Sequence, residues 1–197
     1  MKISSVIFDL GRTLIPFSFD ALGTELEPCR AAVMEAAAEY EVGGCDWAAF
    51  ERRLARLTRL DAAGLVDWWC RIFTLEPLVA PELIAGLRPH FRVGLLSNTN
   101  ECHFRFLCRK LPWLEAAFDF HSLSYEVGAA KPKASIYADA EAKARCAPVE
   151  ILYFDDVPAF VAAARERGWQ AELFRDETGV RASLARFGWG NGAGNRR

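Results

Sequence analysis

Residues 6–14 read Val-Ile-Phe-Asp-Leu-Gly-Arg-Thr-Leu, an apolar run that ends on a carboxylate and a glycine turn. The segment 3–8 is rich in Ile and Val and apolar on both faces, which is typical of a buried strand in a parallel sheet. A strand that delivers Asp9 at its carboxyl end is a common way to build an active site in an α/β protein. This stretch therefore predicts both the fold class and the place of the functional site.

Strand and helix patterns alternate after residue 81, which predicts a parallel sheet covered by helices on both faces. The expected strands there are 92–96, 118–123, 150–154 and 170–174. The expected helices there are 81–88, 100–110, 133–146, 157–167 and 178–187. Residues 24–76 show helical patterns only, with helices expected at 27–40, 46–57 and 62–74.

These patterns divide the chain into three parts. We expect an α/β, Rossmann-like core built from residues 1–16 and 81–187. Residues 17–80 are expected to form a small inserted helical cap. Residues 188–197 are rich in glycine and are expected to be disordered.

Composition limits the classes of partner. The 197 residues suit one domain with a small insertion. With 24 basic and 26 acidic residues the net charge is −2, which argues against a nucleic-acid protein that relies on positive charge. No apolar run is long enough to cross a bilayer, and no signal peptide is recognised. The six cysteines form no Cys-x-x-Cys pair, so reduced thiols and a cytoplasmic location are expected. The protein is expected to be a monomer or a homodimer.

Further polar side chains follow the other predicted strands. Ser97 and Asn98 come after 92–96, the pair Asp155–Asp156 comes after 150–154, and Lys131 precedes a helix. Carboxyl ends of parallel strands meet at one edge, so these groups should converge on Asp9. Together they provide the groups that phosphoryl transfer needs: a nucleophile, a hydroxyl, a fixed cation and a pair of carboxylates. Several carboxylates around one point need a cation, and oxygen ligands favour Mg²⁺.

Each of these side chains also has a purely structural interpretation. Asp9 could simply end its strand, and the acidic pair could cap the helix at 157–167. Ser97 could equally be a helix N-cap, and a single lysine such as Lys131 is usually a solvated surface residue.

Three further motifs complete a family resemblance. They are Leu95–Asn100, Glu126–Tyr137 and Ile151–Asp156. With the first strand and in this order, they resemble the haloacid dehalogenase-like superfamily of hydrolases from residue 3 to about 187. The likeness is greatest to the subgroup that contains bacterial sugar-1-phosphate phosphatases.

The resemblance implies a role for each motif residue. Asp9 attacks phosphorus and forms an aspartyl-phosphate, while Lys131 neutralises charge and holds the nucleophile. The phosphate group is bound by Ser97, Asn98 and Thr13. Magnesium is held by Asp9, Asp156 and the backbone carbonyl of Gly11. Asp155 lies next to these ligands and supports them.

Two positions depart from the family pattern. Gly11 stands where a second aspartate usually protonates the leaving alkoxide, a loss of about 10²–10⁴-fold for poor leaving groups. The resembled subgroup also carries glycine there. Arg12 cannot supply that proton; it either stabilises negative charge or points to solvent. Phe160 replaces a usual asparagine beside the metal.

The resulting hypothesis is a Mg²⁺-dependent phosphatase of small organic phosphate esters, with sugar phosphates among the candidates. Two alternatives stay open: a catalytically weak or silent binding protein, and a haloacid dehalogenase, which needs no metal and so leaves Asp155–Asp156 unexplained. Candidate pocket walls in the cap are Phe17, Phe19, Arg59, Trp68, Trp69 and Arg71. For the two tryptophans, core packing is the favoured interpretation, and the three histidines show no metal-ligand spacing.

Overall fold

The first strand, β1 (Ser5–Phe8), lies at the centre of a five-stranded parallel sheet in the order β3–β2–β1–β4–β5. The computed structural model describes residues 2–190. The other strands are β2 (Arg92–Ser97), β3 (Phe120–Leu123), β4 (Ile151–Asp155) and β5 (Gln170–Leu173). On either side of the central strand, Ile7 pairs with Gly94 and Tyr153. The predicted α/β class with a parallel, Rossmann-like sheet is therefore confirmed.

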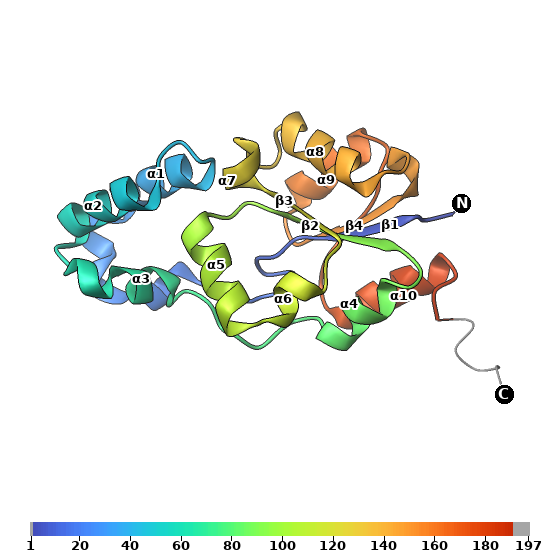
Figure 1. Ribbon diagram of the computed structural model, residues 1–197, viewed down its shortest axis with the longest axis horizontal. Helices are drawn as coiled ribbons and strands as arrows, with labels where there is room; N and C mark the ends of the chain where they lie inside the picture. Colours follow the sequence, from blue (N-terminus) through green and yellow to red (C-terminus); the bar gives the residue numbers. More distant parts are fainter. Residues whose placement is uncertain (1, 191–197) are drawn as a thin grey trace.

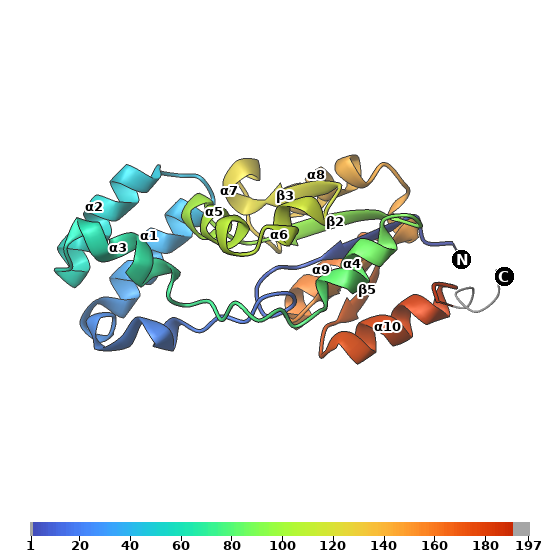
Figure 2. The same ribbon diagram turned by 60° about the horizontal axis from the view of Figure 1, so that its bottom comes forward.

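Helices cover both faces of this sheet, because its strands are apolar on both sides. Val6 and Phe8 face a core shared with α4 (Pro81–Leu87), α5 (Glu101–Lys110), α6 (Trp113–Ala116) and α10 (Glu177–Arg186). Ile7 faces the opposite core, formed with α8 (Ala134–Ala144) and α9 (Pro158–Glu166). Figures 1 and 2 show these two helical layers on either side of the sheet. Two short elements, α7 (Ser124–Val127) and η3 (Pro148–Glu150), lie in the connections.

Apart from two isolated β-bridges, the elements between β1 and α4 are all helical. The elements are η1 (Phe19–Glu25), η2 (Glu27–Cys29), α1 (Arg30–Glu41), α2 (Trp47–Thr58) and α3 (Ala62–Cys70). They enclose a separate apolar core that includes Tyr40, Phe50 and Trp69. We call this part the helical lobe. In Figure 1 it lies beyond one end of the sheet, on the side away from the chain termini.

Local sequence signals explain several boundaries in the helical lobe. Asp46 caps α2 by accepting the Ala49 N–H at 2.8 Å, as its position predicts. The first helix begins three residues later than predicted, because residues 27–29, with a proline at the centre, form a 3₁₀ turn instead. Helix α3 also stops earlier than predicted, at Cys70.

The two chain crossings between the lobe and the sheet run side by side. Phe17 and Phe73 form an antiparallel bridge. The Ser18 N–H donates to the Ile72 carbonyl at 2.9 Å, and the Thr74 N–H donates to Pro16 at 3.0 Å. The lobe is therefore joined to the sheet through one short double-stranded ribbon.

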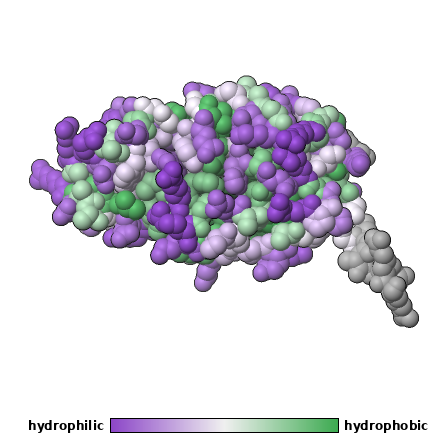
Figure 3. All heavy atoms as spheres, viewed as in Figure 1, coloured by the Kyte–Doolittle hydropathy of each residue, from purple (hydrophilic) through white to green (hydrophobic). Residues whose placement is uncertain are grey.

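The surface and the C-terminal residues give few further indications of function. Over residues 2–190, no helix is both long and apolar enough to cross a bilayer. On the face drawn in Figure 3, hydrophobic residues are interspersed with hydrophilic ones. Of the predicted disordered tail, residues 191–197 lie outside the described part, whereas Trp189 is partly buried against the core on the α10 side.

Candidate active site

Three of the predicted site residues stand at the carboxyl ends of adjacent strands. Asp9 follows β1 directly, Ser97 ends β2 and Asp155 ends β4. Because β2, β1 and β4 are neighbours, these side chains converge at the edge that faces the helical lobe. All three are buried.

Lys131 enters this edge from the segment before α8 and is itself buried, with 4% of its surface exposed. Its ammonium donates to Asp9 Oδ1 at 2.6 Å and to Asp155 Oδ2 at 2.7 Å. Although burial alone lowers the pKa of Lys131, the two carboxylates raise it above its ordinary value. The Phe160 ring centroid lies 5.0 Å from the ammonium, so this aromatic side chain packs over the cation. The surface interpretation of Lys131 is therefore wrong.

Asp155 is held from three sides. Its Oδ1 accepts the Val157 N–H at 2.8 Å, just before α9, and its Oδ2 receives Lys131 and the Tyr153 hydroxyl. The Tyr153 hydroxyl oxygen also lies 3.1 Å from the Lys131 ammonium. The sequence did not single out Tyr153. The available signal is its spacing, because residues two apart on a strand share a face and Asp155 is the second residue after Tyr153 on β4. The contact with Val157 forms a turn ahead of α9 and is not a helix cap, because Val157 is itself the N-cap residue and no side chain caps this helix. The capping interpretation of Asp155 and Asp156 is therefore wrong.

Carboxylate oxygens of Asp9, Asp155 and Asp156 lie within 4.8 Å of one another. Burial raises the pKa of Asp9 to about 7, partly offset by Lys131. Burial and the neighbouring Asp155 likewise raise the pKa of Asp156. A divalent cation would relieve this crowding, and an all-oxygen donor set suits a hard cation such as Mg²⁺. The residues present therefore fit the predicted metal.

The three predicted phosphate-binding residues differ in their surroundings. The Ser97 hydroxyl makes only a long contact of 3.4 Å to the Asn98 carbonyl. The Asn98 side chain makes two hydrogen bonds with the Lys131 backbone. Asn98 Oδ1 accepts the Lys131 N–H at 2.7 Å, and Asn98 Nδ2 donates to the Lys131 carbonyl at 3.2 Å. Thr13 Oγ1 is buried, and nothing within residues 2–190 bonds to it. The N-cap of α5 is Asn100, so the capping interpretation of Ser97 is wrong.

A cavity of about 60 Å³ lies between this edge and the helical lobe. Its lining from the sheet side includes Gly11, Ser97 and Asn98, and its lining from the lobe side includes Phe19 and Glu41. Pockets that hold drug-sized ligands measure about 300–1,000 Å³, so this cavity is much smaller than such a pocket. Glu41 was not predicted, because nothing in the local sequence distinguishes it from other helical glutamates.

The predicted pocket walls are only partly in place. Phe17 and Phe19 line the cavity, whereas Arg59 and Arg71 are exposed to solvent elsewhere. The side chains of Trp68 and Trp69 are buried in the core of the helical lobe, which agrees with the packing interpretation.

The Phe17 ring fills the space in which a side chain at position 11 would lie. A Cβ on Gly11 would lie 2.6 Å from Phe17 Cε1, so the ring occupies the space of the usual aspartate. Arg12 adopts a left-handed backbone conformation with φ of 59°. Its side chain is exposed, and its guanidinium lies 4.9 Å from the Phe17 ring centroid.

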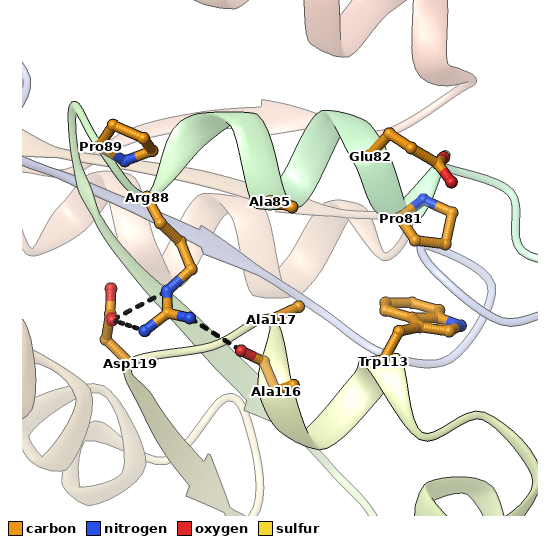
Figure 4. Close-up of a pocket in the computed structure, with 9 residues that line it drawn as sticks. All are labelled: Pro81, Glu82, Ala85, Arg88, Pro89, Trp113, Ala116, Ala117 and Asp119. Atoms are coloured by element: carbon orange, nitrogen blue, oxygen red, sulfur yellow. Dashed lines mark hydrogen bonds and ion pairs between the residues drawn. The ribbon is translucent and has the colours of Figure 1, made fainter.

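A larger cavity lies elsewhere, between α4 and α6. It measures about 580 Å³ and includes Arg88, Trp113 and Asp119 in its wall. Figure 4 shows the Arg88 guanidinium bound to Asp119 and to the Ala116 carbonyl, at 2.7 and 2.9 Å. The charged groups of Arg88 and Asp119 are thus paired with each other, and we do not assign the chemistry to this cavity.

Comparison with known proteins gives consistent findings. A sequence model of the haloacid dehalogenase-like hydrolases matches residues 3–168. A D-ribitol-5-phosphate phosphatase from Bacteroides thetaiotaomicron is 32% identical over 118 residues, which are 57% of this chain and 56% of that enzyme. The matched region is therefore little more than half of that relative's length.

Two solved structures share the fold. A haloacid dehalogenase-family enzyme from Bacteroides thetaiotaomicron aligns with a TM-score of 0.82 at 23% identity, covering 89% of this chain and 95% of its own. That enzyme has also been solved with magnesium and inorganic phosphate. A protein from Porphyromonas gingivalis, described as a predicted hydrolase of the same family, is 27% identical with a TM-score of 0.79, covering 94% of this chain and 98% of its own.

Proposed function

The chain belongs to the haloacid dehalogenase-like hydrolases, and from this premise we propose that it is a Mg²⁺-dependent phosphatase of small organic phosphate esters. The family resemblance inferred from the sequence is thereby confirmed. The observation that carries the proposal is Lys131, buried and bonded to Asp9 and Asp155 beside a third carboxylate. Sugar and polyol phosphates are the favoured substrates, because the aligned curated relative is a D-ribitol-5-phosphate phosphatase.

Asp9 is the proposed nucleophile. Lys131 holds its Oδ1 at 2.6 Å, which fixes the carboxylate and leaves the other oxygen for attack on phosphorus. The new bond joins Asp9 to phosphorus while the bond to the alcohol oxygen breaks, and water then hydrolyses the aspartyl-phosphate. Ser97 and Thr13 are the proposed hydroxyl donors to the phosphate, since Thr13 Oγ1 has no partner within residues 2–190.

We assign the metal ligands to Asp9, Asp156 and the Gly11 carbonyl. Asp155 is already bonded to Val157, Lys131 and Tyr153, so it supports the ligands from behind rather than joining them. When bound, Mg²⁺ supplies positive charge that neutralises the phosphate and the carboxylates. We further propose that the helical lobe, within residues 17–80, is the cap that excludes water from this site.

The missing acid at Gly11 limits the choice of leaving group. Without a proton donor at this position, an ester with a weakly basic leaving oxygen will react faster than an equally well bound ester of an ordinary alcohol. Anomeric sugar phosphates belong to this class, because the leaving oxygen at that carbon is a weaker base than an ordinary alkoxide.

Hydrolysis of p-nitrophenyl phosphate by the purified protein tests the proposal. We expect turnover that requires Mg²⁺ and disappears in Asp9→Asn. The matched control is Asp67→Asn, which removes an exposed carboxylate of the helical lobe and should leave the rate unchanged. Absence of turnover with this ester and with a panel of sugar and polyol phosphates would refute the phosphatase assignment. Metal-free chloride release from 2-chloropropionate would favour a dehalogenase instead.

A further inference from the structure

Glu41 is a carboxylate from the helical lobe that reaches the proposed phosphate site. It is the last residue of α1, and its backbone carbonyl lies 2.6 Å from the Ser124 hydroxyl. That hydroxyl also accepts the Thr99 N–H at 2.9 Å. Since Thr99 follows the end of β2 by two residues, these contacts fix the end of α1 against the loop that follows Ser97.

Glu41 lines the same cavity as Gly11, Ser97 and Asn98. Within residues 2–190, no group donates a hydrogen bond to its carboxylate or forms an ion pair with it. Burial raises its pKa, and the nearby positive charge of Lys131 partly offsets this effect. Glu41 is half-buried rather than fully buried, so the free capacity of its carboxylate to accept hydrogen bonds is open to water or to a ligand in the cavity.

Electrostatics restricts what can fill the cavity beside Glu41. A phosphate group bound at Ser97 and Lys131 leaves the organic part of the ester facing the lobe. A carboxylate or second phosphate on that part would be repelled by Glu41 in a site of low dielectric. Hydroxyl groups would be bound, because hydrogen bonds to a charged acceptor are roughly twice as strong as neutral ones.

We propose that Glu41 selects phosphate esters whose organic part carries hydroxyl groups and no further negative charge, by accepting hydrogen bonds from those hydroxyls. The inference rests on the proposed phosphatase function and narrows its substrate class to polyol and sugar monophosphates. Glu41 is thus a specificity-determining residue supplied by the lobe, distinct from the metal and the nucleophile.

The test compares three esters: D-ribitol 5-phosphate, propyl phosphate, which lacks hydroxyls, and 3-phosphoglycerate, which carries a carboxylate. In the wild type, kcat/KM should be greatest for the polyol ester. Glu41→Leu should reduce the ratio of ribitol phosphate to propyl phosphate by roughly 10- to 100-fold, the value of a hydrogen bond to a charged group. Glu41→Lys should raise the relative rate on 3-phosphoglycerate. Glu35→Gln, on an exposed position of the same helix, should change neither ratio.

The outcomes separate the two proposals. If Glu41→Leu slows ribitol phosphate and propyl phosphate by the same factor, the selectivity role is wrong while the phosphatase assignment stands. If the wild type hydrolyses neither these esters nor p-nitrophenyl phosphate, both fall together. Circular dichroism and the thermal midpoint show whether each variant is folded, and Glu41→Gln, which keeps the size of the side chain, replaces Glu41→Leu if the latter is not.

Discussion

Restoring an acid at position 11 will help catalysis only if Phe17 is shortened at the same time. The added Cβ would lie 2.6 Å from Phe17 Cε1, whereas ordinary contact begins near 3.4 Å, so the ring must move by about 0.8 Å. It has little room, since its centroid lies 5.7 Å from that of Phe19 and 6.2 Å from that of Phe73. Overpacking of this kind costs about 1–3 kcal/mol.

We therefore expect Gly11→Asp alone to lower stability and to give little gain in rate. The double variant Gly11→Asp/Phe17→Ala should place a proton donor beside the leaving oxygen. Its gain should approach 10²-fold or more on alkyl phosphates and be much smaller on p-nitrophenyl phosphate, whose leaving group needs little protonation.

The assay is a plot of log kcat/KM against the pKa of the leaving alcohol for the wild type, both single variants and the double variant. Phe17→Ala alone controls for enlargement of the cavity. The reasoning is refuted if Gly11→Asp alone already flattens this plot. It is equally refuted if the double variant raises every rate by one common factor.

Three further variants test the buried groups around the site. Lys131→Met should abolish turnover and destabilise the protein by about 3–5 kcal/mol in urea unfolding at pH 8, because Asp9 and Asp155 lose their counter-charge; a loss below about 1 kcal/mol would contradict a structural role. Tyr153→Phe, which deletes one hydroxyl bonded to Asp155, should cost about 1 kcal/mol in the same experiment, and an unchanged midpoint would show that this bond contributes nothing. Burial lowers the pKa of His103 from 6.5 to about 4, so the unfolded chain binds the extra proton first as pH falls. Stability from this group is complete above pH 6.5 and should decline by roughly 3 kcal/mol towards pH 4. His103→Asn should lack this part of the pH dependence in parallel urea titrations, and identical slopes for the two proteins would contradict the assignment.

The sequence predicts the site far better from its strands than from its helical lobe. Asp9, Ser97 and Asp155 could be placed together because a buried strand has a recognisable pattern and parallel strands end at one edge. Lys131 could be included only through its order among the motifs, since a lysine before a helix carries no sign of burial.

Other features depend on packing across distant parts of the chain. Glu41 becomes functional only because α1 ends against the loop after β2, a contact that no local pattern encodes. The occupation of the space beside Gly11 by Phe17 is likewise a tertiary effect. Trp68 could be classed with the core from its helical spacing alone, and its indole N–H indeed donates to the Leu22 carbonyl inside the lobe, at 3.0 Å.

The double-stranded ribbon that joins the lobe to the sheet has a consequence for ligand entry. Backbone hydrogen bonds tie residues 16–18 to residues 72–74, so the two crossings act as one joint. The lobe also rests on the rest of the chain through three hydrogen bonds, from Cys102 to Tyr40, between His103 and Trp69, and from Ser124 to Glu41. We therefore expect an ester to enter only when these three bonds break while the paired crossings stay intact.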